Sequence, residues 1–273
     1  MTQRRGAGAG YTSTEGTVFG GKGAMNPFLE DVDAAHYESA RPYFHPLVFQ
    51  RLADFFERRR FPAALDVACG TGQSTEALAA LGEFVVGLDA SAVMLRGARC
   101  RGEIPYVLGL AEQLPFAAGA FDLVTVGNGF HWFDLARFLR EAHRVPRQPG
   151  WLLIYGSGVC GGMRENPAFA GWLKEFDRRF PSPPRESLSA EVLAEAGFRQ
   201  VLSETPVHTE TYSLDQLIAH FKTYSNPITA LQDGRETADW LSRWLRASLA
   251  PMFGGPTGTF EYQGWVLLFA KDG

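Results

Sequence analysis

The spacing of hydrophobic residues divides the chain into segments typical of helices and of buried strands. From residue 61 onward, short continuous apolar runs alternate with segments whose apolar residues recur at helical spacing. The apolar runs cover residues 63–67, 84–88, 105–109, 121–126 and 151–155. The helical segments cover residues 33–40, 46–59, 75–81, 92–98 and 135–144. Alternation with short connections predicts a parallel sheet covered on both faces by helices.

This alternation ends after Tyr155. The remaining chain predicts helices over residues 167–180, 189–196, 213–224 and 235–249, and strands over residues 198–207 and 259–270. We therefore expect an α/β fold with a Rossmann-like, mostly parallel, seven-stranded sheet, an antiparallel last strand and a helical cap. Such sheets bind ligands at the carboxyl ends of their strands, where the strand order reverses.

Composition shifts suggest how the chain is organised. Residues 1–24 are rich in Gly, Ser and Thr and are expected to form a flexible arm. Residues 25–273 are expected to form one domain with a core over residues 60–160. The other expected parts are cap elements over residues 26–58, 156–188 and 213–249 and closing strands over residues 198–207 and 259–270.

The composition excludes several classes of function. The 273 residues are 45% hydrophobic and 21% charged with a net charge of −4, and no Lys/Arg-rich block is present, so nothing indicates nucleic acid or an anionic membrane as a partner. No apolar run reaches the roughly 18 residues of a membrane span. Cys69, Cys100 and Cys160 are too scattered for a disulfide framework or a paired zinc site. We expect a cytoplasmic monomer or homodimer without a metal.

One strand-turn-helix stretch carries the candidate chemistry. Asp66 ends an apolar run, and Gly70 and Gly72 follow in a turn where a ligand can approach the backbone closely. A dinucleotide site usually has a third glycine where this chain has Thr75. Asp89 ends the next strand, 19 positions after Gly70, as expected of a ribose ligand. The acid at position 66 favours a ligand with an ammonium group over a pyrophosphate.

Five segments resemble, in the correct order, the motifs of class I S-adenosylmethionine-dependent methyltransferases. They are residues 65–72, 86–91, 109–116, 121–124 and 144–150. The resemblance implies S-adenosylmethionine as the cofactor and S-adenosylhomocysteine as its product. It implies these cofactor-binding residues: Asp66, Ala68, Gly70, Gly72, Asp89, Ala90, Met94, Ala111, Glu112 and Asn128.

Each assignment has a structural alternative. Asp66 would face the cofactor ammonium or cap a helix, and Asp89 would bind the ribose or close a turn. Glu112 would read the adenine edge or remain a solvated loop acid. Met94 would pack against adenine or belong to the core.

The acceptor side resembles the small-molecule branch that includes trans-aconitate methyltransferase. His131 and Trp132 lie at the end of a central strand, and His131 could act as a base or bond only to the next loop while Asp134 caps the following helix. The resemblance also places Tyr37, Arg41, Tyr43 and Tyr224 near the acceptor. Arg41 could equally form a surface ion pair.

The expected function is methyl transfer to a small molecule. O-methylation of a carboxylate or hydroxyl is favoured, and C- or N-methylation remains open. The alternatives are a module that binds S-adenosylmethionine without turnover and an NAD-dependent oxidoreductase.

Overall fold

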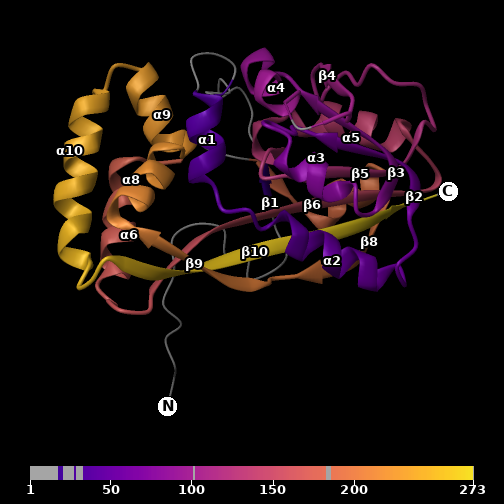
Figure 1. The fold of residues 1–273 in the computed structure, drawn as a ribbon. Helices are drawn as coiled ribbons and strands as arrows, with labels where there is room; N and C mark the ends of the chain where they lie inside the picture. The colour runs from indigo at the N-terminus through magenta and orange to yellow at the C-terminus, as the bar shows by residue number, and fades with distance from the viewer. Residues whose placement is uncertain (1–17, 21–27, 29–32, 101, 183–185, 273) are drawn as a thin grey trace. The chain divides into compact units, whose positions relative to one another are not determined.

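The fold, given by a computed structural model, is described for residues 18–20, 28, 33–100, 102–182 and 186–272 (Figure 1). These residues group into two units. The larger unit holds the described residues of 18–156, 186–205 and 265–272, and the smaller unit holds residues 157–182 and 206–264. Of the predicted arm, residues 1–17 and 21–24 lie outside the described part. Val18–Gly20 form a strand, β1, that the sequence did not predict.

A mostly parallel sheet runs through the larger unit (Figure 1). Its strands, in spatial order, are β4 (Tyr106–Leu108), β3 (Gly82–Asp89), β2 (Phe61–Val67), β5 (Phe121–Gly127), β6 (Pro146–Met163), β10 (Thr257–Lys271) and β8 (Phe198–Glu204). The pairs from β4 to β6 are parallel, and β8 is antiparallel to β10. The predicted Rossmann-like sheet with an antiparallel last strand is confirmed.

The strand order reverses between β2 and β5. The chain leaves β2 toward β3 and β4 on one side, and then returns to β5 and β6 on the other. In open α/β sheets a reversal of this kind leaves a crevice at the carboxyl ends of the two strands. The turn after β2 and the loop after β5 therefore occupy the position expected for a ligand site.

Alternate side chains of the central strands enter different cores. Leu65 and Val124 belong to one buried cluster with Phe138, whereas Ala64 and Leu123 belong to another on the opposite face. A slip of one residue would exchange the two sets, so this alternation fixes the register.

Helices cover the two faces of this sheet. The first cluster is covered by α5 (Leu135–Arg144) and α7 (Ala190–Glu195), and the second by α2 (His45–Phe55) and α3 (Gln73–Leu78). The other elements of the larger unit are α1 (Ala34–Ala40), α4 (Ala92–Ala98), the 3₁₀ turn η1 (Phe130–Trp132) and β7 (Glu186–Leu188), which pairs antiparallel with β1.

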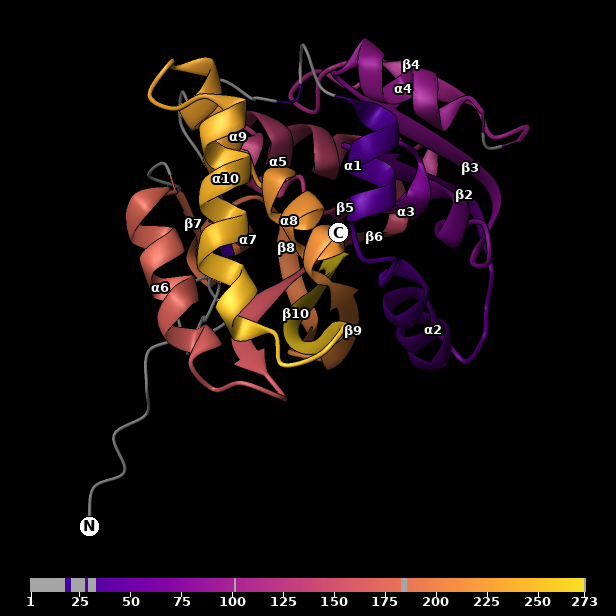
Figure 2. The same ribbon diagram turned by 60° about the vertical axis from the view of Figure 1, so that its left-hand side comes forward.

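Helices make up most of the smaller unit (Figure 2). They pack around a cluster of aromatic side chains. Its helices are α6 (Phe169–Arg179), α8 (Leu214–Lys222), α9 (Ser225–Gln232), α10 (Ala238–Leu249) and the 3₁₀ turn η2 (Ala250–Met252). The ring of Trp172 in α6 lies 4.8 Å from Phe221 in α8 and 6.0 Å from Trp244 in α10. Strand β9 (Val207–Ser213) pairs antiparallel with the first half of β10.

The structure corrects the sequence prediction in the last third of the chain. The predicted strand over residues 198–207 is two strands, β8 and β9, separated at Pro206, so the sheet has eight strands rather than seven. Strand β6 continues beyond Tyr155 to Met163, where irregular chain was expected. Helix α9 was not predicted. By contrast, α4 and α5 have the predicted ends, because Ser91 and Asp134 cap them.

The predicted cap segments divide between the units. Residues 157–182 and 213–249 lie in the smaller unit, and residues 33–58 lie in the larger one. No helix within the described ranges is both long and apolar enough to cross a bilayer.

Candidate functional site

A cavity of about 200 Å³ opens in the larger unit where the central strands end. It is lined by residues that end or follow β2, β3, β4 and β5: Val67, Ala68, Leu88, Asp89, Ala90, Gly109, Leu110, Ala111, Glu112, Gly129, Trp132 and Phe133. Five of the predicted cofactor residues line this cavity: Ala68, Asp89, Ala90, Ala111 and Glu112. Segments that are distant in sequence are therefore brought together at the strand reversal.

Backbone amides hold the Asp89 carboxylate in a fixed orientation. Its Oδ2 accepts a hydrogen bond from Gly70 N at 2.8 Å, and its Oδ1 accepts one from Ser91 N at 2.7 Å. The second bond closes a turn, as one alternative predicted. Burial raises the pKa of Asp89, and the amide hydrogen bonds partly offset this. The amides of Ser91, Gly70 and Ala90 all act on this carboxylate, and a carboxylate has about four acceptor positions, so acceptor capacity remains for a ligand.

Asp66 lies beneath the turn. Its side chain is fully buried, and its oxygens accept hydrogen bonds from the hydroxyls of Ser74 at 2.5 Å, Thr75 at 2.7 Å and Thr125 at 2.9 Å. Burial raises its pKa to about 6 despite these bonds. The helix-cap alternative is wrong, because the N-cap of α3 is Gly72 without a side-chain bond. The contact with an ammonium group stays a prediction.

The two glycines of the turn have different surroundings. A Cβ added to Gly70 would meet no atom within 4 Å, so its backbone faces open space. A Cβ on Gly72 would lie 2.6 Å from Tyr106 Oη, and its φ of +85° is in the left-handed region. Gly70 also has left-handed backbone, with φ +55°, so the turn favours glycine at both positions. Packing confines only Gly72, whereas Gly70 leaves room for a ligand.

Two residues other than glycine adopt left-handed backbone at this edge. Ala68 follows β2 with φ +58°, and Asn128 follows β5 with φ +55°. A Cβ on Gly129 would lie 2.5 Å from that of Ala68, so the two loops pack closely. Asn128 does not line the cavity, and its Oδ1 lies beside Gly156. Strained backbone of this kind is concentrated at functional sites.

Glu112 connects the loop after β4 to the start of α5. Its Oε1 accepts a hydrogen bond from Asp134 N at 2.9 Å, so it is not a free loop acid. Asp134 accepts from Arg137 N and caps α5, as its alternative predicted. These two bonds hold the loop that carries His131 and Trp132 against the cavity.

Aromatic contacts link the N-terminal segment to Trp132. The Phe28 ring lies 6.1 Å from that of Trp132 and 5.4 Å from that of Tyr37. Arg41 lies over Tyr37, with its guanidinium carbon 5.0 Å from the ring centre. Three predicted acceptor-side residues, Tyr37, Arg41 and Trp132, thus belong to one group of contacts beside the cavity.

The remaining predicted residues do not line the cavity. His131 lies in η1 with its ring 4.9 Å from that of Trp132, and Tyr43 is 48% exposed. Met94 is buried and does not line the cavity, as its core alternative predicted. In the smaller unit, Tyr224 Oη lies 3.2 Å from His220 Nε2.

Sequence reasoning missed the partners that hold the site in place. Thr125 is a hydroxyl within the buried apolar run of residues 123–126, and this was the signal for a buried acceptor. His45 and Tyr155 form a buried hydrogen bond of 2.9 Å between α2 and β6. No local pattern predicts that pair, because its members are 110 positions apart.

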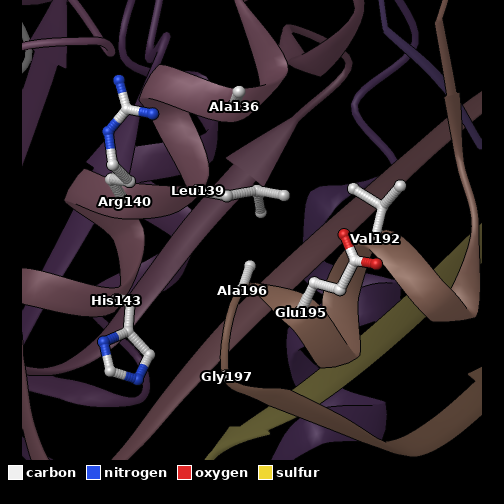
Figure 3. A pocket seen from close by; sticks show the side chains of 8 residues that line it. All are labelled: Ala136, Leu139, Arg140, His143, Val192, Glu195, Ala196 and Gly197. Atoms are coloured by element: carbon white, nitrogen blue, oxygen red, sulfur yellow. The ribbon is translucent and has the colours of Figure 1, made fainter.

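A second cavity, of about 530 Å³, lies between α5 and α7 (Figure 3). It is lined by Ala136, Leu139, Arg140, His143, Val192, Glu195, Ala196 and Gly197. Its charged side chains, Arg140 and Glu195, are exposed, so they are not fixed toward a ligand as in an enclosed site. Within the described ranges, no group of three or more His, Cys, Asp or Glu side chains could hold a metal ion.

Comparisons with known proteins agree with this geometry. Residues 65–154 match the model of a methyltransferase domain family. The chain is 32% identical over 182 residues to a demethylmenaquinone methyltransferase of Chlorobaculum parvum, covering 58% of this chain and 74% of that relative. Several other curated relatives are matched over only 39 to 52% of their length.

Solved structures share the fold. One is a proposed type II methyltransferase from Anaeromyxobacter dehalogenans, with a TM-score of 0.61, 21% identity and coverage of 83% of this chain and 95% of that one. Another is a Haemonchus contortus phosphoethanolamine N-methyltransferase bound to S-adenosylhomocysteine, with a TM-score of 0.51, 16% identity and coverage of 88% and 58%. The sequence match to a relative covered over most of its length, together with this fold, shows that the chain belongs to the class I S-adenosylmethionine-dependent methyltransferases.

Proposed function

We propose that the cavity at the end of β2 and β3 binds the adenosine part of S-adenosylmethionine and that the enzyme methylates a small molecule. The observation that carries this proposal is the carboxylate of Asp89, which is oriented by backbone amides and lines the cavity. A ribose presents two neighbouring hydroxyl donors, which such a carboxylate can accept together. The adenine ring would then lie beside Ala111 and Glu112.

The charge of the site supports this cofactor over a dinucleotide. Asp66 and Asp89 are carboxylates close enough that the charge of Asp89 raises the pKa of Asp66. A pyrophosphate would add negative charge beside both. A ligand with an ammonium and a sulfonium group would instead be attracted by them.

The size of the site is also compatible with the cofactor. A cavity of about 200 Å³ is smaller than the roughly 300–1,000 Å³ of pockets for drug-sized ligands, so it suits one part of the molecule. The methionine part would lie over Gly70, where the backbone faces open space. When bound, the cofactor supplies an activated methyl group on sulfur.

An acceptor with a carboxylate or hydroxyl and an apolar body is the class that the neighbouring residues favour. Phe28, Tyr37 and Trp132 offer an apolar wall, and Arg41 offers a cation that can pair with an anionic group. The Chlorobaculum relative is named for demethylmenaquinone. A quinone-type carbon acceptor with an apolar tail is therefore the alternative that the relatives favour.

The protein's part in the reaction is to orient the acceptor and exclude water. Alignment of two reacting groups supplies about 7–11 kcal/mol of the barrier reduction. A carboxylate acceptor needs no base, whereas a neutral hydroxyl does. His131, beside Trp132, is the candidate that would accept that proton.

Calorimetric titration with S-adenosylhomocysteine tests the cofactor site. We expect micromolar binding by the wild type and a loss of at least tenfold in Asp89→Ala, because the ribose acceptor is removed. Asp54→Ala is the control, since Asp54 is an exposed acid on α2 that lies outside the cavity.

Equal affinity in the wild type and Asp89→Ala, with both variants folded by circular dichroism, would reject the site. A separate assay with the wild-type protein identifies the class of acceptor. Release of S-adenosylhomocysteine is compared among apolar carboxylic acids, hydroxyl compounds, amines and quinones, and release with carboxylic acids or hydroxyl compounds is the expected result.

A further inference from the structure

The segment that leads into α2, residues 33–45, is attached through α1 to the turn that follows β2. Gln73 Nε2, at the start of α3, donates a hydrogen bond to Glu38 O in α1 at 3.4 Å. A Cβ added to Gly97 in α4 would lie 3.7 Å from that of Ala34. Helix α1 therefore packs against the turn that follows β2 and against α4.

His45 attaches the C-terminal end of this segment to β6. It is 8% exposed at the start of α2, and its Nδ1 lies 2.9 Å from Tyr155 Oη in a buried hydrogen bond. Its ring stacks on Phe44 at 4.6 Å, and the edge of Tyr155 meets the rings of Phe44 and Phe49. Among the described residues, neither His45 nor Tyr155 has another side-chain hydrogen bond.

Tyr155 lies where the central strands end. It pairs with Gly127 across β5 and β6, and a Cβ on Gly127 would lie 2.8 Å from its hydroxyl. Its carbonyl accepts a hydrogen bond from the strained Asn128 at 2.9 Å. The bond from His45 thus reaches the same strand edge at which the cavity opens.

The chain between these two attachments contacts the cavity wall. Tyr37 meets Phe28, Phe28 meets Trp132, and Trp132 lines the cavity. Arg41 lies over Tyr37 and is only four positions before His45. His45 is therefore linked along the chain to residues that contact the wall of the cavity.

We propose that His45 is a positioning residue whose hydrogen bond to Tyr155 holds residues 33–45 over the cofactor turn and so sets the affinity for the cofactor. The inference rests on the proposed function of the cavity. His45 itself does not line the cavity, so it acts through Tyr37 and Trp132.

The test removes one hydroxyl. Tyr155→Phe is expected to weaken S-adenosylhomocysteine binding about fivefold, as expected for one hydrogen bond of ordinary strength. The control is Tyr262→Phe, which removes a hydroxyl from an equally buried tyrosine of the smaller unit and should leave this affinity unchanged. His45→Phe should match Tyr155→Phe, and the double variant should bind no more weakly than either, because all three lose the same bond.

Amide hydrogen exchange separates positioning from general destabilisation. Without ligand, Tyr155→Phe should exchange faster in residues 33–43 than the wild type, with β2 and β5 unchanged. Equal affinity in Tyr155→Phe and the wild type, or additive losses in the double variant, would overturn the inference alone. Failure of the wild type to bind S-adenosylhomocysteine would overturn the proposed function. In that case, unchanged exchange of residues 33–43 in Tyr155→Phe would also overturn the positioning role of the His45–Tyr155 hydrogen bond.

Discussion

At the scale of single residues, the site depends on backbone that most side chains avoid. Ala68 and Asn128 both have positive φ, and they follow β2 and β5, the two strands between which the order reverses. A left-handed residue other than glycine costs roughly 1–2 kcal/mol. The surrounding packing sustains this strain at the position where the ligand is proposed to bind.

Substitution of Ala68 measures that strain. Ala68→Gly should raise the free energy of unfolding by about 1 kcal/mol, because glycine adopts φ +58° without a steric cost. Ala68→Val should lower it by about 2 kcal/mol, because a β-branched side chain is poorly tolerated there. Urea denaturation measures both.

Ala77→Gly is the matched control for this pair. It makes the same exchange within α3, where glycine should destabilise the protein by about 1 kcal/mol. If Ala68→Gly destabilised the protein as much as Ala77→Gly does, position 68 would not be strained.

At the scale of elements, Asp66 joins three parts of the fold. It ends β2 and accepts hydrogen bonds from Ser74 and Thr75 of α3 and from Thr125 of β5. Because it is fully buried, these bonds are not replaced by water. The turn thereby keeps one geometry relative to its neighbouring strands.

This buried acid should make stability depend on pH. Its pKa is about 6 in the folded protein against 3.8 in the unfolded chain, so ionisation is easier after unfolding. Its stabilising contribution is complete below about pH 4 and is lost as pH rises to about 6, a change of about 3 kcal/mol. The difference in unfolding free energy between the wild type and Asp66→Asn should therefore fall by that amount from pH 4 to 7, as measured by urea denaturation.

Asp54→Asn, at an exposed position, should show no such trend and serves as the control. A difference between the wild type and Asp66→Asn that stayed constant over this range would contradict the assignment of the raised pKa to Asp66.

Local sequence signals predicted the elements that depend on local interactions. The ends of α4 and α5 were correct because Ser91 and Asp134 cap them through hydrogen bonds to residues three positions later. The length of β6 could not be predicted in this way, because its neighbours in the sheet, β5 and β10, come from other parts of the chain.

The same distinction applies to the candidate site. Asp89, Ala90, Ala111 and Glu112 were predicted because they lie in segments that resemble family motifs, and the structure brings them to one cavity. Tyr155 and its partner His45 were missed because their contact depends on the order of strands and helices. A motif predicts which residues face the ligand but not which residues hold them in place.

At the scale of the whole molecule, two buried groups give opposite pH dependence. Burial lowers the pKa of His45 from 6.5 to about 4, so its contribution to stability is lost as pH falls through this range. The contribution of Asp66 is lost as pH rises through nearly the same range. The two contributions therefore have slopes of opposite sign between about pH 4 and 6 and partly offset one another.

The proposed cofactor cavity lies within one of the two units. All residues that line the proposed cofactor cavity belong to the larger unit, whose motifs match the methyltransferase domain. The smaller unit has its own aromatic core, against which the partly buried Trp240 and Trp244 pack. Recognition of the cofactor can therefore be tested without knowing the acceptor.

The most direct test is a crystal structure of the protein with saturating S-adenosylhomocysteine. We expect the adenosine in the cavity beside Ala111 and Glu112, with both ribose hydroxyls within about 2.6–3.2 Å of the Asp89 carboxylate oxygens. Adenosine bound instead between α5 and α7, or a cavity without ligand at saturation, would contradict the account.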